Sequence, residues 1–202
     1  MSRYRIPKQR SRVEIRVSNS RFITTIGPAF SVKEAQGFVR AIRAEMPDAS
    51  HHVYAFKIGY GASVSEGLSD DGEPNGTAGP PTMAVLRGAD LGDVVLVTTR
   101  YFGGTKLGTG GLVTAYTEAA KAGLAVLETE EKVIRVRYEV DVPYKLLESA
   151  RRLLAEYECV LEGESFEADV RVRFLIAEER VEELGQRLSD LSAGRVTPIR
   201  VD

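Results

Sequence analysis

The sequence predicts an α+β protein of two domains. Runs with alternating apolar positions predict strands, and stripes with helical spacing between them predict helices. Residues 1–128 give the element order ββαβαβα, whereas residues 129–202 give βαββαβ. The charge balance changes at the same point, because residues 1–128 carry 15 Lys/Arg and 12 Asp/Glu and residues 129–202 carry 12 and 17. We therefore place the domain boundary between residues 128 and 129.

The first elements are a hairpin and a helix. Apolar and charged residues alternate from Val13 to Val17, a Ser-Asn-Ser turn follows, and Phe22–Ile26 resumes the apolar pattern, which predicts two antiparallel strands. Ser31 and Glu34 form a capping box, a typical helix start. The apolar stripe behind this box predicts a helix that ends before Pro47.

The middle of the first domain contains a long segment without periodicity. Alternate residues of His52–Ile58 share one face of a strand, and Gly59–Pro81 is then rich in turn formers, which predicts a long loop. Thr82–Ala89 predicts a short helix. Asp93–Thr99 is apolar on both faces, so it predicts a central strand that is covered on both sides. The stripe within Leu112–Gly123 predicts the last helix of this domain.

The second domain shows six elements with clear patterns. Strands are expected at 134–140, 159–161, 168–176 and 196–201, and helices at 146–157 and 181–191. The resulting order βαββαβ is the split βαβ arrangement of ferredoxin-like domains.

Cysteine content and hydropathy limit the class of protein. Cys159 is the single cysteine, which excludes an intrachain disulfide and a zinc site with several cysteines, and we expect no disulfide-linked partner. The longest strongly apolar run is Val94–Val97, and the basic N-terminus is followed by no apolar stretch. We therefore expect a cytoplasmic protein with no membrane partner.

Two glycine-rich segments are the candidate site: SDDGEPNGTAGPP at residues 69–81 and RYFGGTKLGTGG at residues 100–111. In the second segment, a strand end, a turn and a helix start would present backbone N–H groups, hydroxyls and one lysine to an anion. The residues are Gly103, Gly104, Thr105, Lys106, Gly108, Thr109, Gly110 and Gly111. The segment lacks the Walker and dinucleotide patterns, and we expect no resident cofactor. The alternative is that the glycines serve only a tight turn and close helix packing.

The first segment contains three carboxylates within four residues. Asp70, Asp71 and Glu73, with His51 and His52 nearby, could bind a hard metal ion or act as acid and base. The alternative is a turn in which the carboxylates accept backbone N–H groups, and this is the interpretation that we favour. We assign no metal site and no catalytic residue. His52 is expected to pack in the fold or anchor the loop.

Arginines alternate along two strands of the second domain. An exposed arginine face would bind a phosphate backbone, whereas pairing across the strands would neutralise it, and we favour the pairing. The arginines are Arg135, Arg137, Arg171 and Arg173, and the expected partners are Glu139, Asp141 and Asp169.

Taken together, these motifs resemble the IMPACT family, in particular its bacterial YigZ-type branch. The resemblance rests on HHVYAF from residue 51, on SDDGEPNGTAGPP, on TRYFGGTKLGTGGLVTAY and on the Ser20–Phe22 triplet, and it covers residues 20–125. It implies a first domain of the left-handed βαβ type, as in GHMP kinases and a ribosomal small-subunit protein. It also implies a second, ferredoxin-like domain resembling those of elongation factor G.

The resemblance also implies a function and a set of residues. The eukaryotic relatives regulate translation by binding a partner protein, without catalysis. We therefore expect a non-catalytic regulator of translation or its initiation, which binds RNA, the ribosome or a translation-associated protein. The alternative is an enzyme, or a nucleotide- or phosphate-binding protein, that acts on a small anionic substrate. The motif residues carried over are Asp70, Asp71, Glu73, Gly76, Thr77, Gly79, Arg100, Tyr101, Gly103, Gly104, Lys106, Gly108, Gly110 and Gly111.

Overall fold

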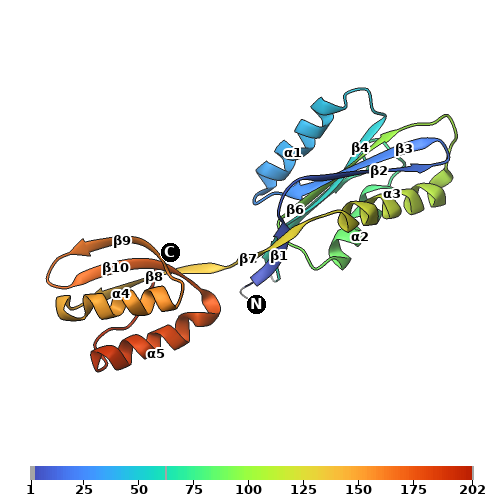
Figure 1. Ribbon diagram of the computed structural model, residues 1–202. Coiled ribbons are helices and arrows are strands. Elements are labelled where there is room, and N and C mark those ends of the chain that lie inside the picture. The colour runs from blue at the N-terminus through green and yellow to red at the C-terminus, as the bar shows by residue number, and fades with distance from the viewer. Residues whose placement is uncertain (1–2, 62, 202) are drawn as a thin grey trace. The chain divides into compact units, whose positions relative to one another are not determined.

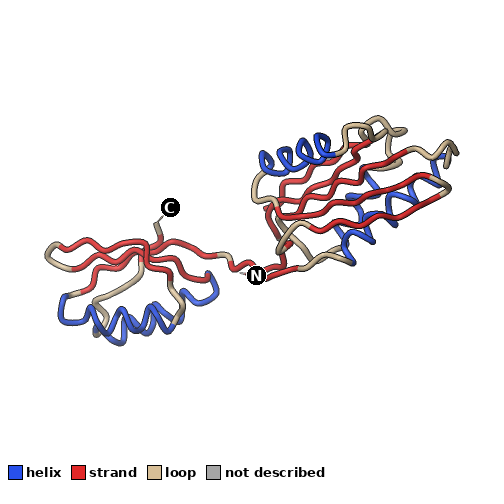
Figure 2. Tube along the Cα trace, turned by 45° about the horizontal axis from the view of Figure 1, so that its top comes forward, coloured by secondary structure: helices blue, strands red, loops and turns tan. Residues whose placement is uncertain are grey.

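The computed structural model describes residues 3–61 and 63–201 (Figure 1). The described chain divides into two compact units, one from Tyr4 to Lys132 and one from Val133 onward that also includes Arg3. The division follows Lys132, at the end of a charged segment. Each unit contains both helices and strands, which confirms the α+β fold class (Figure 2).

The first domain is built on a five-stranded sheet with the order β2-β3-β6-β4-β5. The strands are β2 (Ser11–Val17), β3 (Ser20–Pro28), β4 (His51–Tyr60), β5 (Ser63–Ser69) and β6 (Val94–Tyr101). All neighbouring pairs are antiparallel. The central strand β6 is buried from its first residue to Arg100, as its apolar sequence predicts.

Helices cover both faces of this sheet (Figure 1). Helix α1 (Val32–Glu45) packs on β4 and β6 from one side, and α2 (Gly79–Gly88) and α3 (Gly108–Ala125) pack together on the other side. The predicted helix start of α1 is confirmed at Ser31, whose Oγ accepts from the Glu34 N–H at 3.1 Å. The return bond of the capping box is shifted by one residue, because Glu34 Oε2 accepts from the Phe30 N–H at 2.9 Å.

The prediction of a long loop at residues 59–81 is wrong. Strand β5 occupies residues 63–69 and α2 begins at Gly79, so the irregular segment is limited to residues 70–78, called the acidic loop below. Strand β5 lies at an edge of the sheet and carries polar residues, which hid its period. Gly67 pairs with Phe56, and a Cβ there would lie 2.3 Å from the Phe56 ring. The missing side chain therefore makes room for the ring.

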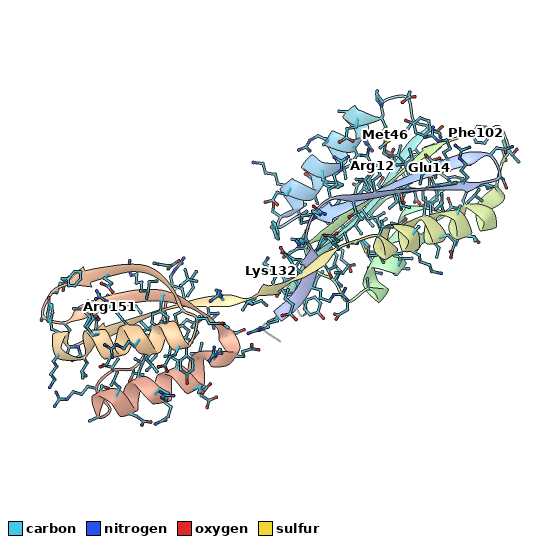
Figure 3. All side chains as sticks on the ribbon, viewed as in Figure 1. Arg12, Glu14, Met46, Phe102, Lys132 and Arg151 are labelled. Carbon is cyan, nitrogen blue, oxygen red and sulfur yellow. The ribbon has the colours of Figure 1, made fainter. Side chains whose placement is uncertain are left out.

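The sequence analysis did not predict two short strands. Strands β1 (Arg3–Pro7) and β7 (Thr129–Val133) form a two-stranded sheet, although both are highly charged. Asp93, which is 2% exposed, holds them to the first domain. Its carboxylate accepts from Tyr4 Oη at 2.6 Å, Lys132 Nζ at 2.5 Å and the Gly59 N–H at 2.8 Å. Figure 3 marks Lys132 on this ribbon.

The second domain has a four-stranded antiparallel sheet in which the strands lie in the order β11-β8-β10-β9. Along the chain its main elements follow the predicted ferredoxin-like order βαββαβ. Its elements are β8 (Arg135–Val142), α4 (Leu147–Glu156), β9 (Val160–Phe166), β10 (Val170–Ala177), α5 (Val181–Ser192) and β11 (Ile199–Arg200). One apolar core joins the helices to the sheet. Two strand lengths were wrong, because β9 continues to Phe166 and β11 contains only two residues.

Candidate functional site

The carboxylate of Asp70 is hydrogen-bonded by backbone N–H groups of the acidic loop and of the start of α2. Its Oδ1 accepts from the N–H groups of Ala78 and Gly79 at 2.9 and 2.8 Å, and its Oδ2 accepts from the Gly76 N–H at 2.9 Å. Burial alone would raise the pKa of Asp70, but these backbone hydrogen bonds lower it below its ordinary value. Because Ala78 and Gly79 begin α2, Asp70 caps this helix from a distance in sequence. Thr77 adds a hydrogen bond from its hydroxyl to the Pro74 carbonyl at 2.7 Å.

Asp71 fastens the loop to the start of β4. Its Oδ2 accepts from the His52 N–H at 2.6 Å, its Oδ1 pairs with Arg43, and its carbonyl lies 2.8 Å from His51 Nδ1. The register places His51 opposite Arg100 and His52 opposite Thr99. Residues directly opposite each other on neighbouring strands point to the same face of the sheet, so His51 and Arg100 share one face and His52 and Thr99 share the other.

His52 lies on the other face of the sheet. Its Nδ1 is 3.1 Å from Thr99 Oγ1, and burial lowers the pKa of its ring. Its ring therefore packs in the fold and its N–H holds Asp71 of the loop, which are the two roles expected for it. The histidine ring that faces Glu73 is that of His51, whose Nε2 lies 3.9 Å from Glu73 Oε2.

Glu73 and Arg100 form a buried ion pair. The side chains are 3% and 5% exposed, and Glu73 Oε1 accepts from Arg100 Nη1 at 2.7 Å and from Tyr116 Oη at 2.8 Å. Burial, the charge of Glu73 and this hydrogen bond raise the pKa of Tyr116, so its hydroxyl remains a donor. The cluster joins the acidic loop, β6 and α3.

The rest of Arg100 is enclosed by aromatic rings and a serine. Its guanidinium carbon lies 5.4 Å from the Phe22 ring centroid and 5.5 Å from that of Phe102, and its Nη2 donates to Ser20 Oγ at 3.3 Å. Its Nε–H has no acceptor within the described part of the chain. The same Ser20 Oγ accepts from the Gly103 N–H at 3.2 Å, so one hydroxyl positions both the arginine and the turn after β6.

Residues 102–107, called the glycine turn below, connect β6 to α3. A Cβ at Gly103 would lie 2.1 Å from the carbonyl carbon of Asn19, so this glycine serves close packing on the β2–β3 turn. Gly108 opens α3 with φ of 70°. Among the residues that the structure describes, no side chain caps the start of α3, so the first-turn N–H groups have no side-chain acceptor there. Lys106 is exposed and forms no ion pair or hydrogen bond with the residues that the structure describes.

The two glycine-rich segments meet at a cavity of about 340 Å³. One wall comes from the acidic loop, and the other comes from a continuous segment that runs from the end of β6 through the glycine turn to the first turns of α3. The lining residues are Glu73, Pro74, Arg100, Phe102, Lys106, Leu107, Gly108, Thr109 and Leu112. We call this the loop–turn cavity.

Not every residue of the expected site reaches the loop–turn cavity. Glu73, Arg100, Lys106, Gly108 and Thr109 line it. Most of the others belong to the same two segments but are not lining residues, and these are Asp70, Asp71, Gly76, Thr77, Gly79, Gly103, Gly104, Thr105, Gly110 and Gly111. Tyr101 lies on the α1 side, where its hydroxyl donates to Asp48 at 3.0 Å and Arg21 stacks on its ring.

Sequence reasoning missed Phe102 as a lining residue and Tyr116 as a partner of Glu73. Phe102 carried a signal, because a large aromatic residue stands between the end of an apolar strand segment and the glycine pair Gly103–Gly104. Tyr116 carried none, since its position in an apolar helical stripe is that of an ordinary core residue.

Two alternative binding sites lose support. Within the described ranges, no group of three His, Cys, Asp or Glu residues is arranged to hold a metal ion. The second-domain sheet has a hollow of about 580 Å³ over its arginine face, but the arginines are paired. The pairs are Arg137 with Glu162, Arg171 with Asp141 and Arg173 with Glu139, while Arg135 donates to the Glu158 carbonyl. The favoured pairing is thus present for Arg171 and Arg173 with two of the expected partners, whereas Arg137 pairs with Glu162, Arg135 bonds a neutral carbonyl and Asp169 is not a partner in these pairs.

Family profiles match both parts of the chain. A profile described as the Impact N-terminal domain matches residues 18–124, and one described as a domain of unknown function, DUF1949, matches residues 140–195. The chain belongs to the IMPACT family. The IMPACT family member YigZ of Escherichia coli is 35% identical over 203 residues, with full coverage of both chains. A family member from Haemophilus influenzae is 36% identical and covers 97% of this chain and 96% of its own.

Solved structures include a close match to the whole IMPACT-family chain. A crystal structure described as that of a hypothetical protein aligns with a TM-score of 0.76 and 35% identity, and covers 100% of this chain and 98% of its own. The two-domain translational regulator Yih1 aligns over 56% of this chain at 20% identity with a TM-score of 0.36, which is too low to assign a function. No helix in the described ranges is long and apolar enough to cross a membrane.

Proposed function

We propose that this IMPACT-family protein regulates translation without catalysis, by binding RNA at the loop–turn cavity. The observation that carries the proposal is the convergence of both glycine-rich segments on one cavity, which contains Lys106 and the start of α3, neither of which has a side-chain partner within the described ranges. A translation-regulatory role agrees with the family resemblance described above. RNA is the partner that best fits a small cationic site with apolar walls.

The local charges favour an anionic ligand. Glu73 and Arg100 neutralise each other across a 2.7 Å hydrogen bond, so Lys106 supplies the remaining charge of the lining. The unpaired N–H groups at the start of α3 add about half a positive charge. A phosphate group would therefore gain from both the lysine and the helix, without displacing a protein carboxylate.

The state of the carboxylates supports binding without catalysis. Asp70 accepts three backbone N–H groups, Asp71 is held by His52 N–H and Arg43, and Glu73 is held by Arg100 and Tyr116. A general base must be within reach of a substrate proton. Each of these groups instead stabilises the loop.

Binding is tested by fluorescence anisotropy of a short labelled RNA, titrated with the full chain over a range of salt concentrations. We expect affinity to fall as salt rises, with each phosphate contact contributing about 0.7 to the logarithmic slope. Lys106→Gln should weaken binding by roughly 3- to 10-fold and reduce the slope by about one contact. The matched control is Lys33→Gln, an exposed lysine of α1 on the opposite face of the sheet, which should leave binding unchanged.

Absence of RNA binding at low salt would overturn the proposal, as would equal effects of the two lysine variants. Turnover of a small phosphorylated compound at a rate that does not change when RNA is added would favour the enzymatic alternative instead.

A further inference from the structure

Phe102 is the least expected feature of the loop–turn cavity. It directly follows β6, lines the cavity and is 49% exposed. Figure 3 shows it at the end of the first domain where α3 begins. Single exposed apolar rings are common on protein surfaces, but this ring forms part of the wall of a cavity, where a ligand would cover it. Arg100 lies 5.5 Å from the ring centroid, which helps to hold the ring in place.

The composition of the cavity indicates the size and kind of ligand. Pro74, Leu107 and Leu112 provide apolar walls beside Phe102, whereas Lys106 is the exposed cation. An inorganic anion needs the cation but not the apolar walls. A volume of about 340 Å³ is at the lower end of the range for small-ligand pockets and suits a group that combines a flat ring with a charge.

A buried donor at the same place also points to a ligand. Arg100 is 4% exposed and lines the cavity, yet its Nε–H has no acceptor within the described residues. Buried polar groups are almost always satisfied by protein, water or ligand. This observation is independent of the uncapped start of α3.

We propose that the loop–turn cavity binds one unstacked nucleotide of single-stranded RNA, with the base against Phe102 and the phosphate near Lys106 and the first turn of α3. The inference rests on the proposed RNA binding and specifies its substrate class. Bases of a duplex are stacked and paired, so their faces are not available to an aromatic ring. The protein should therefore prefer single strands, with little dependence on sequence.

The test compares single-stranded and duplex RNA of the same sequence with three variants of the full chain. Phe102→Ala should weaken single-strand binding by roughly 10- to 100-fold, because one base–aromatic stack is lost, and should leave duplex binding unchanged. Phe102→Tyr retains the ring and should restore most of the affinity. Phe30→Ala removes an exposed ring of similar accessibility (51%) outside the cavity, and should have no effect.

A second measurement uses the unmodified protein and so does not depend on a variant folding. Photo-cross-linking of a single strand that contains 5-iodouridine should label Phe102, as identified by mass spectrometry. Cross-links confined to other regions would overturn the inference, as would equal affinity for both RNA forms or equal effects of Phe102→Ala and Phe30→Ala. If no RNA binds in any form, the proposed function itself fails, which is a distinguishable outcome.

Discussion

Replacing Glu73 with glutamine tests whether the buried ion pair holds the acidic loop on the sheet. The variant keeps the shape of the side chain but removes the negative charge that faces Arg100, whose side chain is 5% exposed. Oε1 of Glu73 accepts two hydrogen bonds, at 2.7 Å from Arg100 and at 2.8 Å from Tyr116. A hydrogen bond to a charged group contributes about 1.5–3 kcal/mol.

The unpaired guanidinium adds to this loss. Breaking a buried pair by removing one partner typically costs about 3–5 kcal/mol, and we expect Glu73→Gln to lower the free energy of unfolding of the first domain by about that amount. Tyr116→Phe leaves the ion pair intact and should cost about 1.5 kcal/mol. The double variant Glu73→Gln/Arg100→Met removes both charges, so it should be more stable than Glu73→Gln alone.

The assay is urea unfolding followed by NMR, with the amide signal of Leu96 in the buried strand β6 as the reporter of the first domain. A reporter inside one domain is needed because a two-domain chain need not unfold in one step. The reasoning is refuted if Glu73→Gln costs less than about 1 kcal/mol. It is also refuted if the effects of Glu73→Gln and Arg100→Met, each measured alone, add to the effect of the double variant within about 0.5 kcal/mol, since contacting residues should couple.

Two further predictions concern the loop and the turn. Asp70→Asn keeps the Oδ1 acceptor but places an NH₂ group where Oδ2 accepts from the Gly76 N–H, and it removes the negative charge at the start of α2, so it should destabilise the first domain by about 1 kcal/mol. Because the folded-state pKa of Asp70 lies below its unfolded value of about 3.9, the stabilisation is full above that pH and is lost as the pH falls through the folded pKa. The difference in stability between the two proteins should therefore shrink below about pH 4. Gly103→Ala should cost about 1–3 kcal/mol in thermal unfolding, because its Cβ would collide with Asn19, whereas Gly110→Ala, with open space around it inside α3, should be neutral or stabilising by up to about 1 kcal/mol; equal effects of the two would contradict the packing argument.

Local patterns predicted the elements whose signal lies in neighbouring residues. The apolar run of β6 and the capping box of α1 were recognised because burial on both faces and a cap each leave a short-range mark in the sequence. Strand β5 was missed because an edge strand has polar residues on both sides of its pleat. Strands β1 and β7 were missed because each is defined only by the other, across most of the first domain.

The sequence by itself determined the α+β class, the ferredoxin-like order, the family and the two segments that form the candidate site. Only the tertiary structure decided what each carboxylate does. Asp70, Asp71 and Glu73 are near neighbours in the chain, yet one is bound by its own loop, one by the start of β4 and one by Arg100 and Tyr116, which follow it by 27 and 43 residues. The physical reason is that a hydrogen-bond partner is chosen by proximity in space, whereas composition and spacing report only proximity along the chain.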